Sequence, residues 1–123
     1  MKNKNFSGGL FARKPTPLTL RETSLSARIV EILNARGIYN DRLQSGTVRT
    51  SAGHWIHLCK KGTPDRLAIV RARAVFIEVK QHNRQPTPEQ IERHNELRRA
   101  GAVVLVVDSI EKFCAELDTL LAE

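Results

Sequence analysis

The chain has 123 residues, a length that fits one domain with a single modest core. Its 20 Lys and Arg outnumber its 13 Asp and Glu, and this excess favours a polyanionic partner such as nucleic acid, although generic basic proteins share it. Two cysteines, Cys59 and Cys114, argue against a disulfide framework and for a reducing compartment. No apolar run approaches the roughly 20 residues of a membrane-spanning helix, and Gly8 and Gly9 interrupt any signal-peptide core. We therefore expect a cytoplasmic protein that does not enter membranes.

Residues 1–17 are dominated by Lys, Asn, Gly and Pro and carry too few apolar side chains to build a core. Segments of this composition cannot bury enough apolar surface to offset the entropy of ordering. The sequence therefore predicts a flexible basic tail over residues 1–17 and a folded domain over residues 18–123.

A helix is predicted from Leu20 to Arg36, with Thr19 as its N-cap and Gly37 as its stop. Its apolar stripe consists of Leu25, Ile29, Ile32 and Leu33. Because Glu22 precedes Leu25 by three residues, we expect its carboxylate to point towards the sheet. Glu31 lies off the stripe and should be solvated. The alternative role of Glu22 is to complete the capping box with Thr19.

A β-rich region follows this helix. A first short strand is predicted at 41–43, and a hairpin at 47–50 and 54–58 turns across Ser51-Ala52-Gly53. Trp55 in this hairpin is interpreted as a core residue or a stacking surface.

The next segment combines His54, His57 and Cys59, which could suggest a zinc site. Positions 54 and 57 face opposite sides of a strand, and no fourth ligand is apparent. A structural role is therefore favoured for these three residues.

The following hairpin carries charge within an apolar pattern. Its strands are predicted at 67–70 and 74–79, joined through Arg71-Ala72-Arg73. A turn centred on Ala72 sets position 65 opposite position 79, which brings Asp65 within one register step of Glu78. Glu78 and Lys80 are two residues apart on a strand and therefore share a face. Three charges are expected to converge at this end of the hairpin.

Such a convergence is costly without a ligand. Two like charges about 4 Å apart repel by roughly 4 kcal/mol at an effective dielectric constant of about 20. Carboxylate oxygens arranged in this way suit Mg²⁺ or Mn²⁺, which prefer hard oxygen ligands. A structural ion pair between Lys80 and Asp65 or Glu78 explains the same spacing, so both interpretations remain open on spacing alone.

The last third of the chain predicts a helix, a strand and a second helix. Thr87 caps the first helix, Pro88 occupies its first position and Gln90 has the capping-box spacing, while Gly101 ends it. Gln90, His94 and Leu97 share one face of this helix. Residues 102–107 read as a buried strand, and the final helix begins after Asp108. The order predicts a mixed sheet flanked by helices, in the α/β class.

Taken in order, these motifs resemble the VRR-NUC domain (virus-type replication-repair nuclease) of the PD-(D/E)XK nuclease superfamily, from about residue 19 to the end. Each motif is common alone, and the ordered set carries the resemblance. The matching segments are Glu22 before a helix that ends at Gly37, Arg42-Leu43-Gln44-Ser45-Gly46 against Arg-x-Asn-Ser-Gly, Gly62-Thr63-Pro64-Asp65 against Gly-x-x-Asp, Ile77-Glu78-Val79-Lys80 against Ile-Glu-Val-Lys, and Thr87-Pro88-Glu89-Gln90 against Ser-Pro-x-Gln. Gln44 replaces the usual Asn, which affects contacts of that side chain rather than the metal site.

The resemblance implies a restriction-endonuclease-like fold and a Mg²⁺- or Mn²⁺-dependent, structure-selective DNA endonuclease, acting on branched DNA or Holliday junctions in replication or repair. It implies that Asp65 and Glu78 bind the metal together with the Val79 carbonyl. Glu22 would reach the metal directly or through a water. Lys80 would orient or help deprotonate the attacking water, and Gln90 would position that water or Lys80, at the expense of its capping role.

The resemblance also bears on partners. The candidate DNA contacts are Arg42, Ser45, Lys60, Lys61 and Arg84. A homodimer is implied by likeness to stand-alone members and would suit a two-fold branched substrate. The alternative is a catalytically silent nucleic-acid-binding module with the same fold. The presence of Glu22, Asp65, Glu78 and Lys80 together favours the enzyme. An unrelated α/β protein with a surface ion pair leaves the ordered motifs unexplained.

Overall fold

The computed structural model describes residues 17–123, and the side chains of residues 22–123. The predicted tail of residues 1–17 lies outside this part of the chain, apart from Pro17, which begins the first helix. Within residues 17–123, no helix is both long and apolar enough to cross a membrane.

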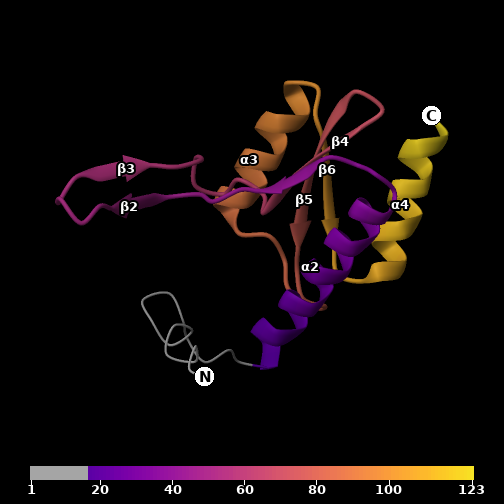
Figure 1. Cartoon of the computed structure of the whole chain (residues 1–123), viewed down its shortest axis with the longest axis horizontal. Coiled ribbons are helices and arrows are strands. Elements are labelled where there is room, and N and C mark those ends of the chain that lie inside the picture. The colour runs from indigo at the N-terminus through magenta and orange to yellow at the C-terminus, as the bar shows by residue number, and fades with distance from the viewer. Residues whose placement is uncertain (1–16) are drawn as a thin grey trace.

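The architecture is a mixed four-stranded sheet with three helices, and it confirms the predicted α/β class (Figure 1). The sheet order is β1-β4-β5-β6, in which only the β5–β6 pair is parallel. A separate two-stranded sheet, β2-β3, extends away from the body as an arm (Figure 1). The elements are α2 (Pro17–Ala35), β1 (Asn40–Arg42), β2 (Thr47–Arg49), β3 (Trp55–His57), β4 (Arg66–Val70), β5 (Arg73–Val79), α3 (Pro88–Arg99), β6 (Val103–Val107) and α4 (Ile110–Ala122).

The main core lies between one face of the sheet and the pair of helices α2 and α4. Alternate residues of the sheet strands point into it, because side chains on a strand alternate between faces. Its buried residues are Ile29, Leu33, Ala68, Val70, Val75, Ile77, Val79, Leu105, Val107, Phe113, Leu117 and Leu120. The even-numbered positions of β5 therefore face the other side of the sheet, where α3 lies.

Helix α2 begins earlier than predicted. It starts at Pro17 rather than Leu20, so Thr19 lies inside the helix and is not its N-cap. Proline suits the first turn of a helix because its missing N–H has no partner there. The predicted stripe packs as expected, with Ile29 and Leu33 each 1% exposed. The chain leaves the helix at Gly37 with φ +68°, the left-handed conformation that glycine adopts without strain.

The charged hairpin forms, but its turn is shorter than predicted. Val70 pairs with Arg73, so the loop contains only Arg71 and Ala72, both with positive φ. Two left-handed residues are the geometry of a tight hairpin turn, usually supplied by Asn and Gly. The register is therefore shifted by one residue, and extending it from the Arg66–Ile77 pair sets Asp65 opposite Glu78 rather than opposite Val79.

Other boundaries differ from the prediction by one residue or so. β1 begins at Asn40 rather than Asp41, β2 and β3 are each shorter than predicted, and β6 begins at Val103. Trp55 is not a core residue, since 61% of its surface is exposed. The core interpretation failed because the β2–β3 hairpin extends beyond the sheet, where no helix covers it (Figure 1).

Helix α3 has the predicted start. Thr87 is its N-cap, and both halves of the capping box with Gln90 are present. The loop before Asp65 passes directly against this start: a Cβ at Gly62 would collide with the carbonyl of Glu89 and lie 3.0 Å from the amide nitrogen of Gln90. Gly62, with φ +88°, therefore fixes the distance between the Asp65 loop and α3.

We predict that Gly62→Ala destabilises the protein more than Gly37→Ala does. Both positions have positive φ, so each substitution costs about 1 kcal/mol in backbone strain. Only Gly62 adds a collision with α3, which should cost roughly 1–3 kcal/mol more. Urea unfolding followed by circular dichroism measures the difference, and equal destabilisation by the two variants would contradict the close approach described here.

Candidate active site

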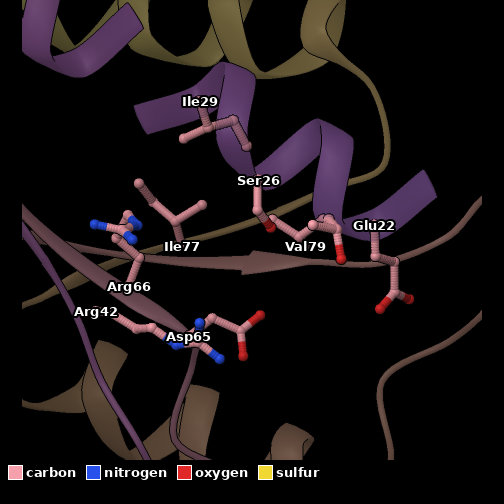
Figure 2. A pocket seen from close by; sticks show the side chains of 9 residues that line it. Glu22, Ser26, Ile29, Arg42, Asp65, Arg66, Ile77 and Val79 are labelled. Carbon is pink, nitrogen blue, oxygen red and sulfur yellow. The ribbon is translucent and has the colours of Figure 1, made fainter. Parts of the chain in front are cut away.

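A pocket of about 250 Å³ opens where α2 meets the ends of β4 and β5 (Figure 2). Asp65 and Glu22 approach it from opposite walls, one from the start of β4 and the other from α2 (Figure 2). The residues that line it are Glu22, Thr23, Ser26, Ile29, Arg42, Asp65, Arg66, Ile77 and Val79.

Glu78 lies at the centre of the charged cluster. It is only 3% exposed and sits in a strand whose other residues are mainly apolar. Burial raises its pKa to about 8, the neighbouring Asp65 and Glu22 carboxylates act in the same direction, and Lys80 opposes them. The structure therefore brings together Glu22, Asp65, Glu78 and Lys80, the four charged residues singled out in the sequence.

Gln90 holds Glu78 from the α3 side. Its Nε2 donates to Glu78 Oε2 at 3.4 Å, while its Oε1 accepts from the backbone N–H of Thr87 at 2.9 Å. The prediction that capping and site contact exclude each other is therefore wrong. An amide side chain has a donor end and an acceptor end, and Gln90 uses one for each role.

His94 is a site residue whose role the sequence reasoning missed. It is 3% exposed, and its Nε2 lies 3.5 Å from Glu78 Oε1. Burial lowers the pKa of His94, and the positive charges of Arg98 and Lys80 lower it further. The i, i+4 spacing with Gln90 was a usable signal, because it sets both side chains on the face of α3 towards Glu78.

Glu22 also lines a second pocket of about 240 Å³, together with Lys80. The other residues of that wall are Leu25, Gln81, His82 and Asp108. Glu22 is half-buried and lines both pockets, with Asp65 in the first and Lys80 in the second. Glu31, by contrast, is exposed and lies 3.6 Å from Arg28 in an ion pair.

Two guanidinium groups line the first pocket from the β1–β4 side, on the same wall as Asp65 (Figure 2). Arg42 and Arg66 are directly paired between β1 and β4, and both line the pocket with Asp65 (Figure 2). Arg66 donates to Asn40 Oδ1 at 2.8 Å. The sequence reasoning named Arg42 but missed Arg66, although its place directly after Asp65 was a signal for proximity to the site.

The remaining predicted DNA contacts lie around the site at different distances from it. Lys60 and Lys61 are exposed and form ion pairs with Glu96 and Glu89 of α3. Ser45 forms an isolated backbone β-bridge with Cys59 at the base of the β2–β3 arm. Arg84 is exposed in the loop before α3. None of these four lines the Asp65 pocket.

The oxygen donors of the charged cluster suit a divalent cation that keeps several of its waters. Among the described residues, no three His, Cys, Asp or Glu side chains are grouped closely enough to hold a metal by themselves. Mg²⁺, however, is commonly held by one or two carboxylates and keeps several waters. Asp65 and Glu78 supply two carboxylates whose mutual repulsion a cation would relieve, so the oxygen donors fit Mg²⁺ or Mn²⁺.

Comparison with known proteins supports the resemblance read from the motifs. A solved structure described as a VRR_NUC domain matches 84% of this chain and 96% of its own length, with 27% sequence identity and a TM-score of 0.58. The chain matches no protein-family model. The structural match confirms the VRR-NUC resemblance and the PD-(D/E)XK fold.

A curated relative adds a second likeness. "Putative nuclease p44" of Acyrthosiphon pisum secondary endosymbiont phage 1 is 39% identical over 51 residues, which are 41% of this chain. The match spans only 55% of that relative's length. Both comparisons therefore point to proteins described as nucleases or nuclease domains.

We predict that Glu78→Gln stabilises the metal-free protein, and increasingly so as the pH rises. Between the ordinary glutamate pKa of 4.5 and about 8, the unfolded chain ionises Glu78 while the folded chain keeps it protonated, so wild-type stability falls across this window. Glutamine removes this penalty, and a pKa raised from 4.5 to about 8 corresponds to a gain of roughly 4 kcal/mol at pH 8.

Urea unfolding in EDTA at pH 5 and pH 8 measures this difference. Glu116→Gln, on an exposed position of α4, is the matched control and should change stability little at either pH. A Glu78→Gln protein that is less stable than the wild type at pH 8 would show that the ionised carboxylate is favoured in the fold.

Proposed function

We propose that this protein is a Mg²⁺- or Mn²⁺-dependent endonuclease that hydrolyses phosphodiester bonds in DNA, with a preference for branched structures. The observation that carries the proposal is the buried Glu78 beside Lys80 and beside Asp65, which lines a pocket, on the fold of a VRR_NUC domain. A buried carboxylate is rarely placed beside a second one without a function that needs both.

The metal would be held by Asp65, Glu78 and the backbone carbonyl of Val79, with Glu22 reaching it directly or through a water. When bound, such a cation neutralises phosphate charge and lowers the pKa of a coordinated water. These four groups supply only oxygen atoms as ligands, which agrees with the preference of a hard cation.

The chain's own side chains complete the chemistry. Lys80 can orient the attacking water and stabilise the negative charge that develops on the phosphate. Gln90 and His94 fix the position of the Glu78 carboxylate from α3. Arg42 and Arg66, which line the pocket on the Asp65 side, can bind phosphate oxygens, since guanidinium groups pair well with them.

We predict that Asp65→Asn and Lys80→Met each reduce cleavage at least about 100-fold, because each removes charge that stabilises the transition state. Purified protein is incubated with labelled duplex, flap, forked and four-way-junction DNA, with Mg²⁺, with Mn²⁺ and with EDTA. Lys112→Met, at an exposed position of α4, is the control and should cleave normally.

Unchanged cleavage by Asp65→Asn in a contaminant-free preparation would overturn this assignment. A wild-type protein that binds these DNAs but cuts none of them would instead identify a catalytically silent nucleic-acid-binding module.

We predict that Glu22→Gln lowers cleavage strongly and that Glu31→Gln does not. Both residues lie on α2, but only Glu22 lines the pocket with Asp65, whereas Glu31 is exposed and paired with Arg28. The two variants make the same chemical change on one helix, so the comparison isolates position. Initial cleavage rates at saturating Mg²⁺ measure it, and equal rates for the two variants would exclude a role for Glu22.

A homodimer is part of the same proposal. Two copies related by a two-fold axis would present two such sites to the two strands of a branched substrate. Light scattering coupled to size-exclusion chromatography measures the assembly, and a strict monomer that cuts junctions symmetrically would contradict it.

A further inference from the structure

The β2–β3 arm is the part of the structure that the proposed catalytic machinery leaves unexplained. All residues of β2 and of β3 are exposed, so neither strand is covered by the body of the protein (Figure 1). A two-stranded hairpin is only marginally stable in water. An uncovered hairpin that carries large apolar side chains at its surface is therefore suited to bind a partner molecule.

The two faces of the arm differ in chemistry. The register pairs Arg49 with Trp55 and Val48 with Ile56, so these pairs lie on opposite faces. On the first face the Arg49 guanidinium lies 5.4 Å from the centroid of the Trp55 ring. This stacking covers one side of the indole, and Trp55 still remains 61% exposed. One face thus offers an aromatic plane beside a cation.

The charge of the arm has a single sign. No Asp or Glu occurs between Asp41 and Asp65, a stretch that includes the whole arm and carries Arg49, His54 and His57 on it. A guanidinium stacked on a ring keeps its N–H groups at its edge, where they can reach a phosphate. This composition is complementary to a polyanion with aromatic bases and unsuited to a basic or purely apolar contact.

The arm is also continuous with the candidate site. Cys59 N donates to Gln44 O at 2.9 Å, and Leu43 N donates to Asp65 O at 2.8 Å, so backbone pairing connects the arm to the loop that carries Asp65. From this base to the tip the ribbon is about six residues long, which at roughly 3.3 Å per residue reaches about 20 Å. A DNA strand held on the arm therefore lies within about one helical turn, roughly 34 Å, of the loop that carries Asp65.

We propose that the β2–β3 arm is a DNA-binding element in which Arg49 contacts a phosphate and the free face of Trp55 stacks on an unpaired base at a fork, branch or strand end. This inference rests on the proposed action on DNA and adds the source of its preference for branched substrates. Base stacking on an aromatic side chain needs a base outside the duplex stack, and it does not depend on which base it is.

The first test uses the wild-type protein. Trp55 is the only tryptophan in the sequence, so its fluorescence reports on the arm alone. In EDTA, saturating forked DNA should reduce quenching of Trp55 by acrylamide at least about twofold, because a stacked indole is shielded. Unchanged quenching at saturation overturns the proposal. If quenching of Trp55 instead falls when the protein concentration is raised without DNA, the arm binds a second copy of the chain, and the proposal is also overturned.

The second test uses variants that keep the propensity for strand structure. Trp55→Val should weaken binding of forked DNA about 5- to 150-fold and binding of a blunt duplex of the same sequence less than about threefold. Ile56→Thr, on the opposite face of the same strand, is the matched control and should leave both affinities unchanged. Equal losses on forked and blunt DNA, or an equal loss with Ile56→Thr, overturn the stacking assignment.

Arg49 is tested through the salt dependence. Arg49→Ala should reduce the slope of log affinity against log salt by about 0.9, the value for one phosphate contact, whereas Arg99→Ala on the last turn of α3 should not. An unchanged slope for Arg49→Ala excludes the phosphate contact.

These measurements need no cleavage, which separates this proposal from the previous one. A protein that binds forked DNA through Trp55 but cuts nothing refutes the nuclease and supports the arm. A protein that cuts forked DNA, with Trp55→Val binding as tightly as the wild type, refutes the arm and leaves the nuclease standing.

Discussion

The structure depends on keeping one carboxylate, that of Glu78, buried in the central strand of the sheet. Its neighbours on β5 face the main core, while Glu78 itself faces α3 and is met there by Gln90 and His94. Burial of a carboxylate without partners is too costly for a domain of this size. The loop at Gly62 and the capped start of α3 are therefore best understood as the parts that bring those partners within reach.

The sequence predicted the elements well where a local signal and a tertiary requirement agree. The alternation in β5, the apolar stripe of α2 and the capping box at Thr87 are each specified by neighbours within a few residues, and each formed as predicted. The hairpin register was predicted one residue away from its actual value. Arg71 and Ala72 carry no preference for left-handed backbone, and only the pairing of the two strands imposes it.

The contacts around Glu78 were harder to predict, for a physical reason. Gln90 and His94 are 12 and 16 residues away from Glu78 along the chain, and the helix that carries them could pack against the sheet at several angles. The close contact between Gly62 and the start of α3 selects one of these packing angles. This contact can be recognised only once both backbones are placed. Trp55 was placed correctly in a strand but wrongly in the core. The alternating pattern of a strand assigns a side chain to one face of the sheet, but it does not show whether another element covers that face.

The parallel pairing of β5 with β6 has a consequence for how the protein acquires its chemistry during synthesis. The backbone hydrogen bond that follows this ladder, from Lys80 N to Val107 O, uses an acceptor in β6, which lies 27 residues later in the chain than Lys80. Lys80 is thus anchored only after β6 has been made and has paired with β5. A ribosome-bound fragment that ends before β6 carries Asp65 and Glu78 without this anchor, so it has the acidic residues of the cluster but not the backbone hydrogen bond that fixes Lys80.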